Sequence, residues 1–446
     1  MRLTQVTSFP PHNIQSTKDT HNSSSVLPTE NEPTVINLKN GIKIIAEEMP
    51  GAISCAMSIW VKTGSVNENI KNNGISHFIE HMMFKGTEKR SALDISKESE
   101  SVGANLNAFT SQELTCYYTK VLGEHAMVPL EILLDMVFNS KLDDTELTNE
   151  KKVVLEEIKM YEDKPNNSAI KLAYSTLWNK HPLGRPIIGT NETVSGLSKD
   201  RIRQYLNDFY TPSNMVISIA GKFNIDDVVK LVVNSTPKTK TKTKEVKLPV
   251  LSTNSDVVIQ NKDINQAHLA LVTKGISIND ERKFTLAITE EILGGGMSSR
   301  LFQEVREKRG LAYTISSFSD SFKAGGLSGV YAGTSIKDSK LALGLILDEL
   351  NKMKTDGVQD EELKKAKVNL KSSILMNLES TAGRAERNAE QNIYYNKFFS
   401  TKAVSQFIES VTNKDITELT RELFNPKHFT LAVVGNKKKL PKNIEL

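Results

Sequence analysis

Two histidines and a glutamate form the segment of this chain that is best suited to chemistry. His77 and His81 are four residues apart, so on a helix both imidazoles lie on one face with their Cβ atoms roughly 5–6 Å apart. Two imidazoles at that separation can share a zinc ion at about 2.0–2.1 Å. Glu80 lies on the same face, where its carboxylate can reach a water molecule on the ion and act as a general base. The pattern predicts a catalytic metal site, with two histidines on an ordinary polar helix face as the alternative.

A site of this kind needs a third protein ligand, and a later acidic segment offers one. Glu150 and Glu157 are seven residues apart, which is two helical turns, so they point the same way. We expect Glu157 to complete a site of two histidines and one glutamate with an open position for water, and Glu150 to lie beside it as a supporting acid. Without the histidines, the same acids would indicate only a solvated helix face.

Helices and strands must hold these residues in place. We expect helices over residues 74–86, 92–102, 126–139 and 145–162. We expect strands over residues 52–64, 105–110, 115–122 and 265–275. Because helices and strands do not alternate strictly, this order favours a mixed or antiparallel sheet over a dinucleotide-binding fold.

The two halves of the chain resemble each other. Residues 205–221 (YLNDFYTPSNMVISIAG) and 419–435 (LTRELFNPKHFTLAVVG) both read as a helix, a turn at proline and an apolar strand that ends at glycine. Their prolines and their final glycines match in register. This internal duplication predicts an α+β fold of two homologous domains, each a mixed or antiparallel sheet covered by helices on one face.

Composition marks the expected boundaries. Residues 235–249 alternate Lys with Thr between prolines and are expected to be a solvated linker, with a polyanion-binding patch as the alternative. The linker separates an N-terminal domain that carries the histidines, residues 34–234 (the first half), from a homologous C-terminal domain without them, residues 250–446 (the second half). Residues 1–33 are polar, rich in proline and without an apolar signal core, so we expect a disordered tail.

The overall composition excludes several classes of protein. The chain has 446 residues, of which 38% are hydrophobic and 25% charged, as in ordinary globular proteins. A net charge of +4, without a basic stripe, predicts no nucleic-acid partner, and no apolar run reaches the roughly 18–20 residues of a membrane span. Cys55 and Cys116 are too few for a disulfide framework. Mild basicity and the lack of an export signal favour a cytoplasmic location.

The string HFIEHMMFKGT (77–87) is an inverted zinc-binding signature, and it resembles the pitrilysin/insulinase family of zinc metallopeptidases. The resemblance implies that Glu157, about 76 residues after the second histidine, completes the metal site, that Glu150 supports it, and that Phe84 contacts substrate. It also implies that the string NAFTSQELTCYY (107–118) is an edge strand. Asn107 and Ala108 would then offer backbone groups to a bound peptide.

The second half carries no such histidine pair. Instead, Arg306 and Tyr313 match a pair that, in the family, hydrogen-bonds the substrate carbonyl and the developing oxyanion, a charge that appears only in the transition state. By composition alone, Arg306 would be a surface charge on a helix. The resemblance covers about residues 34–435 and is nearest to the two-domain bacterial processing-protease branch and to the β subunit of mitochondrial processing peptidase.

The predicted function is that of a zinc endopeptidase with one zinc ion per chain, acting on unfolded peptides or presequences. Because members of this branch pair as two-chain clamshells that enclose a chamber, the resemblance implies a homodimer in which Arg306 and Tyr313 of one chain face the zinc of its partner. Three alternatives remain open at this point. They are a catalytic subunit that needs a non-catalytic partner in a heterodimer, a catalytically silent scaffold, and a peptide-binding chaperone module.

Overall fold

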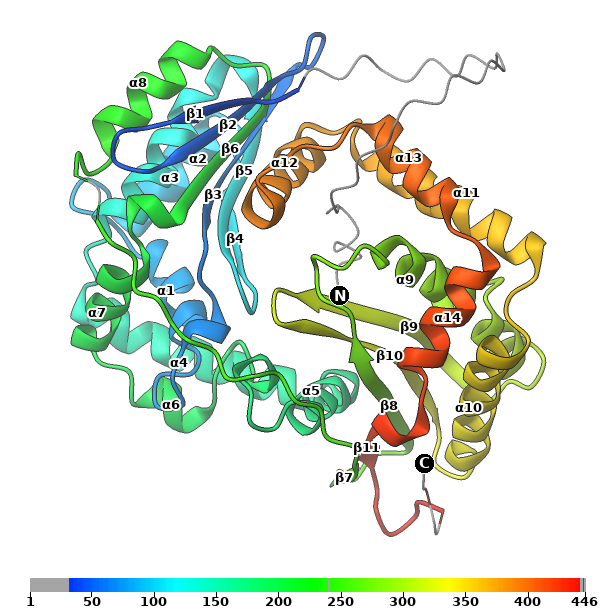
Figure 1. The fold of residues 1–446 in the computed structure, drawn as a ribbon. Coiled ribbons are helices and arrows are strands. Elements are labelled where there is room, and N and C mark those ends of the chain that lie inside the picture. The colour runs from blue at the N-terminus through cyan, green and yellow to red at the C-terminus, as the bar shows by residue number, and fades with distance from the viewer. Residues whose placement is uncertain (1–31, 240, 442–443, 445–446) are drawn as a thin grey trace, which may run out of the picture.

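The fold comprises two mixed β-sheets and the helices that cover them, as predicted for an α+β protein (Figure 1). The computed structural model describes residues 32–239, 241–441 and 444. The expected tail, residues 1–33, lies outside this range apart from its last two residues. Among the described residues, no helix combines the length and the apolar character that a membrane crossing requires.

The first half contains a six-stranded sheet in the order β1-β2-β6-β3-β5-β4. Neighbouring strands are antiparallel except β2 and β6, which are parallel. The strands are Thr34–Asn37 (β1), Lys43–Glu48 (β2), Ser54–Val61 (β3), Asn107–Thr110 (β4), Thr115–Leu122 (β5) and Met215–Gly221 (β6).

The second half repeats this arrangement in a five-stranded sheet with the order β7-β11-β8-β10-β9. Its single parallel pair is β7 and β11. The strands are Val257–Asn261 (β7), Gln266–Gly275 (β8), Ala312–Phe322 (β9), Gly325–Ser335 (β10) and Thr430–Gly435 (β11). Apart from β1, the two sheets have the same strand order and the same parallel pair, which confirms the predicted homology of the halves.

The four helices whose bounds were predicted lie close to them. The helices of the first half are Ile75–Met83 (α1), Ala92–Ser101 (α2), Met127–Asn139 (α3), Asp144–Asp163 (α4), Pro165–Leu177 (α5), Asn191–Ser195 (α6), Lys199–Phe209 (α7) and Ile225–Ser235 (α8). Those of the second half are Lys283–Glu290 (α9), Ser339–Thr355 (α10), Asp360–Asn377 (α11), Thr381–Tyr395 (α12), Thr401–Ser410 (α13) and Asn413–Leu423 (α14).

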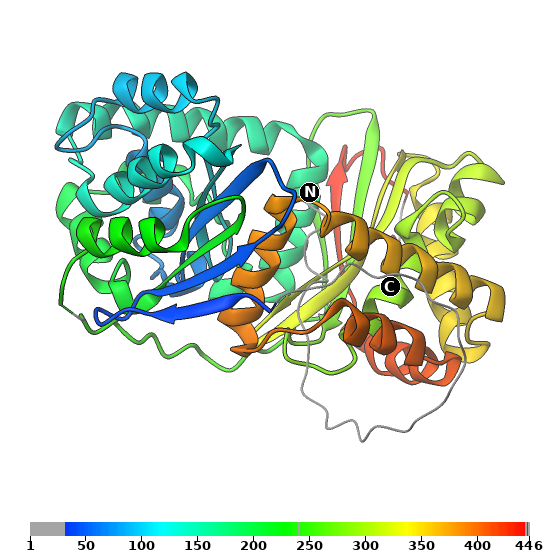
Figure 2. The same ribbon diagram turned by 90° about the horizontal axis from the view of Figure 1, so that it is seen from above.

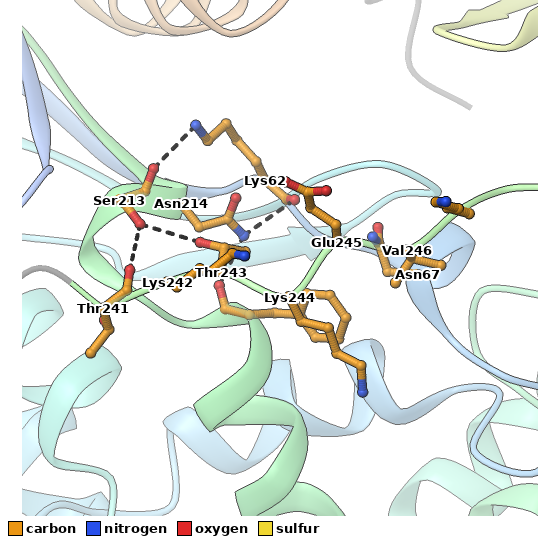
Figure 3. A pocket seen from close by; sticks show the side chains of 12 residues that line it. Lys62, Asn67, Ser213, Asn214, Thr241, Lys242, Thr243, Lys244, Glu245 and Val246 are labelled. Carbon is orange, nitrogen blue, oxygen red and sulfur yellow. Dashed lines mark hydrogen bonds between the residues drawn. The ribbon is translucent and has the colours of Figure 1, made fainter.

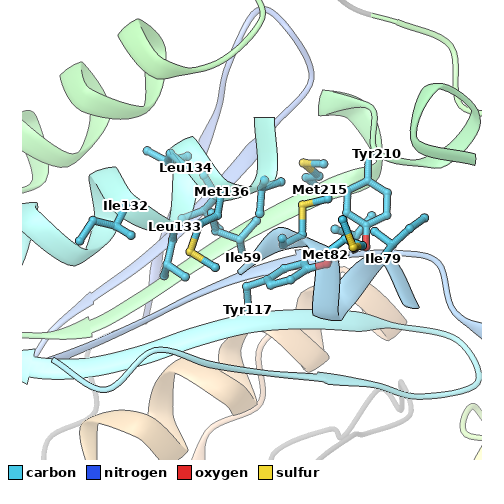
Figure 4. Close-up of a cluster of buried hydrophobic side chains, with 14 of the residues drawn as sticks. Ile59, Ile79, Met82, Tyr117, Ile132, Leu133, Leu134, Met136, Tyr210 and Met215 are labelled. Atoms are coloured by element: carbon cyan, nitrogen blue, oxygen red, sulfur yellow. Dashed lines mark hydrogen bonds between the residues drawn. The ribbon is translucent and has the colours of Figure 1, made fainter. Parts of the chain in front are cut away.

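One face of each sheet packs on helices of its own half. In the first half, Ile59 of β3 meets Ile79 and Met82 of α1 and Leu133 of α3 in a buried cluster (Figure 4). Because side chains alternate along a strand, the neighbouring residue Trp60 points to the opposite face. Trp60 is nevertheless 2% exposed, so the second face must also be covered.

A helix from the other half covers each second face. In Figures 1 and 2, α12 lies along the first sheet, where Ala389 joins the buried cluster around Trp60. Conversely, α5 packs on β8 and β11 of the second sheet through Ala169 and Ala173. The sequence predicted helices on one face, and this exchange adds one helix to the other face of each sheet.

The expected linker contains neither helix nor strand between residues 241 and 249. It is nevertheless held to the first half. Ser213 Oγ donates to Thr241 O at 2.8 Å, and Lys244 Nζ lies 2.7 Å from Asp208 Oδ2. The precise domain bounds stay a prediction.

Candidate active site

Helix α1 places both histidines on one side, as their spacing predicted. The ring centroids of His77 and His81 are 4.6 Å apart. His77 is buried, and His81 is half-buried near the end of the helix.

Helix α4 brings the third predicted ligand to the histidines. Glu157 Oε2 lies 3.7 Å from His77 Nε2 and 3.4 Å from His81 Nε2. His77, His81 and Glu157 each offer one ligand atom, and these three atoms all lie within 4.8 Å of one another. These three residues, called here the metal cluster, form the only such group of three or more among the residues that the structure describes.

The chemistry of the metal cluster fits a zinc ion. His77 Nδ1 and Glu157 Oε2 are buried, and neither atom has a hydrogen-bond partner among the described residues. Buried polar atoms without partners are costly, and a cation bound by the metal cluster would give Glu157 Oε2 its partner. Burial and the neighbouring His81 lower the pKa of His77 to about 4, which keeps its ring in the neutral form that binds metals. Two imidazoles and a carboxylate are also the donor set of catalytic zinc sites.

Glu150, predicted as a supporting acid, contacts one of the two histidines. Its Oε1 lies 2.7 Å from His81 Nδ1, which fixes that nitrogen as the donor and leaves Nε2 for the metal. Its Oε2 lies 2.6 Å from Lys85 Nζ, a partner that the sequence analysis missed. Burial acts to raise the pKa of Glu150, but the hydrogen bonds with His81 and Lys85 outweigh it and lower the pKa.

Glu80 lies on α1 with the histidines and is held by the neighbouring strand β4. Its Oε2 accepts a hydrogen bond from Thr110 Oγ1 of β4 at 2.5 Å. Burial raises the pKa of Glu80 above its ordinary value, which favours uptake of a proton by its carboxylate. Thr110 is a second residue that the sequence analysis missed.

The predicted substrate-binding residues lie on or near the same strand. Asn107 and Ala108 belong to β4, the terminal strand of the first sheet, and Asn107 is exposed. Phe84 directly follows α1 and is half-buried against the core of the first half. Within the described chain, one side of β4 is thus unpaired in the sheet, which is the geometry that strand addition requires.

Arg306 and Tyr313 lie together in the second half. Arg306, in the helical turn Phe302–Glu307, packs over the rings of Phe302 and Tyr313 at 4.6 and 5.3 Å from the centroids. Tyr313 is 78% exposed. Among the described residues, no hydrogen bond or ion pair joins either residue to the metal cluster.

Comparison with known proteins gives the family. Residues 43–191 match the family model described as insulinase (peptidase family M16), and residues 196–370 match the model described as peptidase M16 inactive domain. A protein of Bacillus subtilis (strain 168) named as an uncharacterized zinc protease is 38% identical over 403 residues, 90% of this chain and 98% of that protein. The chain belongs to peptidase family M16.

Further relatives and solved structures support the assignment of this protein to family M16. An uncharacterized zinc protease of Rickettsia felis is 34% identical over 402 residues, 90% of this chain and 97% of that protein. A crystal structure of a protease from Helicobacter pylori has a TM-score of 0.86 at 23% identity, covering 91% of this chain and all of that one. A chain of complex III2 from Candida albicans has a TM-score of 0.79 at 18% identity, and the match covers 92% of this chain and 97% of that one. The two structures establish the fold alone, while the relatives' names support a zinc metallopeptidase.

A surface pocket lies apart from the M16 metal cluster. It has a volume of about 790 Å³ and contains none of the predicted site residues (Figure 3). Lysines and threonines of the linker line it opposite Ser213 and Lys62, whose Nζ donates to Ser213 O at 3.3 Å. Glu245 is the one carboxylate in its lining, which contains no histidine. The pocket therefore lacks the set of carboxylates and imidazoles that metal-dependent hydrolysis uses.

Proposed function

We propose that this M16 protein is a zinc-dependent endopeptidase that hydrolyses unfolded peptides or presequences. The observation that carries the proposal is the convergence of His77 and His81 from α1 with Glu157 from α4. The zinc protease names of its relatives support it.

The side chains around the metal cluster suit peptide hydrolysis. A zinc ion there would polarise the scissile carbonyl and acidify the attacking water molecule. Glu80 accepts the proton of that water and delivers it to the leaving amine. Glu150 keeps His81 in the tautomer that leaves Nε2 free to act as a ligand.

The edge strand accounts for the proposed substrate class. An extended peptide adds to β4 through backbone hydrogen bonds, which depend little on side-chain identity. Asn107 and Ala108 are placed for this contact. Because a folded domain cannot add a strand in this way, the substrates are unfolded segments.

The proposal includes a homodimer, with a heterodimer that contains a non-catalytic partner as the alternative. In the homodimer, Arg306 and Tyr313 of one chain stabilise the oxyanion that forms at the metal cluster of its partner. Mixing a Glu80→Gln chain with an Arg306→Ala chain tests this arrangement, because a mixed dimer then retains one complete site. Activity that does not recover on mixing counts against it.

The decisive experiment is digestion of a library of unfolded peptides, with the products identified by mass spectrometry. Cleavage should stop when a chelator removes the metal and return when zinc is added. The Glu80→Gln variant should bind one zinc ion per chain and lose at least about 100-fold in kcat. Peptide binding that survives the chelator, without any cleavage by the wild type, would favour a binding module instead.

A further inference from the structure

The helix that carries both histidines begins without a cap of its own. Its N-cap is Gly74, which has no side chain and a φ of 93°. A Cβ at this position would meet Gly189 Cα at 2.8 Å, so only glycine fits here. The first turn of a helix leaves backbone N–H groups without partners inside the helix. At the start of α1, another residue must therefore accept them.

Glu68, six residues before the N-cap, accepts two of these hydrogen bonds, while Asn72 O accepts a third from Ile75 N at 3.0 Å. Its Oε2 accepts from Gly74 N at 2.7 Å, and its Oε1 accepts from Ser76 N at 2.9 Å. Asn73 Nδ2 also donates to Oε2, at 2.8 Å. The carboxylate is thus the cap of α1, and Glu68 is only 4% exposed.

The segment that carries Glu68 is anchored to a distant part of the first half. Arg185 Nη1 donates to the backbone oxygen of Glu68 at 2.7 Å, and Asn73 Nδ2 also donates to Pro186 O at 3.0 Å. Ser76 Oγ lies 2.8 Å from Tyr205 OH of α7. The beginning of α1 therefore has a fixed place relative to the segment around residue 185 and to α7.

The groups around Glu68 suit an ionised carboxylate. Two backbone N–H groups and the Asn73 amide nitrogen contact its oxygens, and all three donate. An ionised carboxylate accepts all three, and a negative charge at a helix N-terminus is stabilised further by the helix dipole. Burial raises the pKa of Glu68 to about 7, while these donors act to lower it.

His77 depends on this cap more than His81 does. His77 lies in the first turn of α1, one residue after Ser76. Its Nδ1 has no hydrogen-bond partner among the described residues, and its Nε2 lies 3.7 Å from Glu157 Oε2, which is too far for a hydrogen bond. By contrast, Glu150 orients the ring of His81. The position of the His77 ring is therefore set by its packing and by the backbone that Glu68 holds.

We propose that Glu68 is a positioning residue for the metal cluster, which holds the first turn of α1 so that His77 meets His81 and Glu157 at one ion. The inference rests on the proposed zinc site and adds a residue to it. Glu68 does not touch metal or substrate. Its effect reaches the site through Gly74 and Ser76.

The test measures metal binding in the full-length chain. Glu68→Gln keeps the shape of the side chain but turns an N–H2 group toward one of the donors. We expect its zinc affinity, measured by competition with a chromophoric chelator, to fall about tenfold, at the lower end of effects seen for residues that support metal ligands. The visible spectrum of the cobalt(II)-loaded variant should also change, because it reports the ligand geometry.

Glu290→Gln is the matched control. Glu290 is a half-buried residue at the end of α9 in the second half, where it accepts from Ser319 Oγ at 2.8 Å. This variant should bind zinc as the wild type does, even if its stability falls. Wild-type affinity and spectrum in Glu68→Gln, or equal weakening in both variants, would overturn the proposal.

If Glu68→Gln does not fold, the milder variant Asn73→Ala tests the proposal instead. Asn73→Ala removes one hydrogen bond to the same carboxylate and should weaken zinc binding in the same direction by a smaller factor. An unchanged affinity and cobalt spectrum in Asn73→Ala would then overturn the proposal. A wild type that binds no zinc would instead refute the proposed function itself.

Discussion

Glu150→Gln tests how the metal cluster is supported. Glu150 Oε1 lies 2.7 Å from His81 Nδ1, and its side chain is 4% exposed. Hydrogen bonds to charged groups contribute about 1.5–3 kcal/mol and neutral ones about 0.5–1.5 kcal/mol, so the substitution should cost about 1–2 kcal/mol of zinc binding. That cost corresponds to a zinc affinity about 5- to 30-fold weaker. Glutamine at position 150 would also place an N–H2 group beside the ammonium group of Lys85. Both groups are donors, so their present contact would be lost.

The assay is chelator competition at fixed pH, with circular dichroism to confirm that the variant is folded. Glu156→Gln on the same helix is the control, since among the described residues Glu156 forms an ion pair with Lys159 alone and its side chain is 71% exposed. Exposed pairs contribute about 1 kcal/mol or less, and this pair does not touch the histidines, so zinc affinity should stay within about twofold. If folded Glu150→Gln also bound zinc within twofold of the wild type, the supporting role of Glu150 would be wrong.

Two further predictions concern stability. Burial raises the pKa of Glu290 from 4.5 to about 8, so folding favours its protonated form, and this stabilisation is lost progressively as the pH rises from 4.5 to about 8. Between pH 6 and 8 the free energy of unfolding should therefore fall by about 2 kcal/mol more in the wild type than in Glu290→Gln. Urea denaturation at both pH values checks this, and equal falls would contradict it. Gly74→Ala should lower the free energy of unfolding by at least about 1–3 kcal/mol, because alanine is strained at a φ of 93° and its Cβ would also meet Gly189 Cα at 2.8 Å. An unchanged melting temperature would argue against this strain.

Local signals in the sequence were enough to predict the duplication. The prolines and glycines that match between residues 205–221 and 419–435 mark a helix, a turn and a strand in each half. The structure has these elements as α7 with β6 and α14 with β11. Each signal acts within a few residues of its own position, so it could be read without knowledge of the tertiary structure.

The exchange of α5 and α12 could not be predicted in the same way. Ala169 and Ala173 of α5, like Ala385 and Ala389 of α12, are four residues apart and form a small apolar face. Such spacing shows that a helix has a face to bury, but it does not show which sheet receives it. The partner is set by packing between residues about 100 to 300 positions apart in the chain.

The residues of the candidate site show the same difference between local signals and long-range packing. The spacing of His77, Glu80 and His81 is a property of one helix, and it predicted which residues share a face. Glu68 was missed because a lone acid in a polar segment is expected to be exposed. Its only signal is the glycine N-cap six residues later, which leaves the helix start without a capping side chain.

The helix exchange also has a consequence for synthesis on the ribosome. The first sheet is complete once β6 has emerged, but the helix that covers Trp60 follows roughly 170 residues later. At about 5–20 residues per second, this delay lasts about 10 to 35 s. During that time the aromatic face of the nascent sheet is open to water and to other chains. A chain interrupted at residue 249 would keep this face open permanently, so we expect truncated products to aggregate or to be held by chaperones.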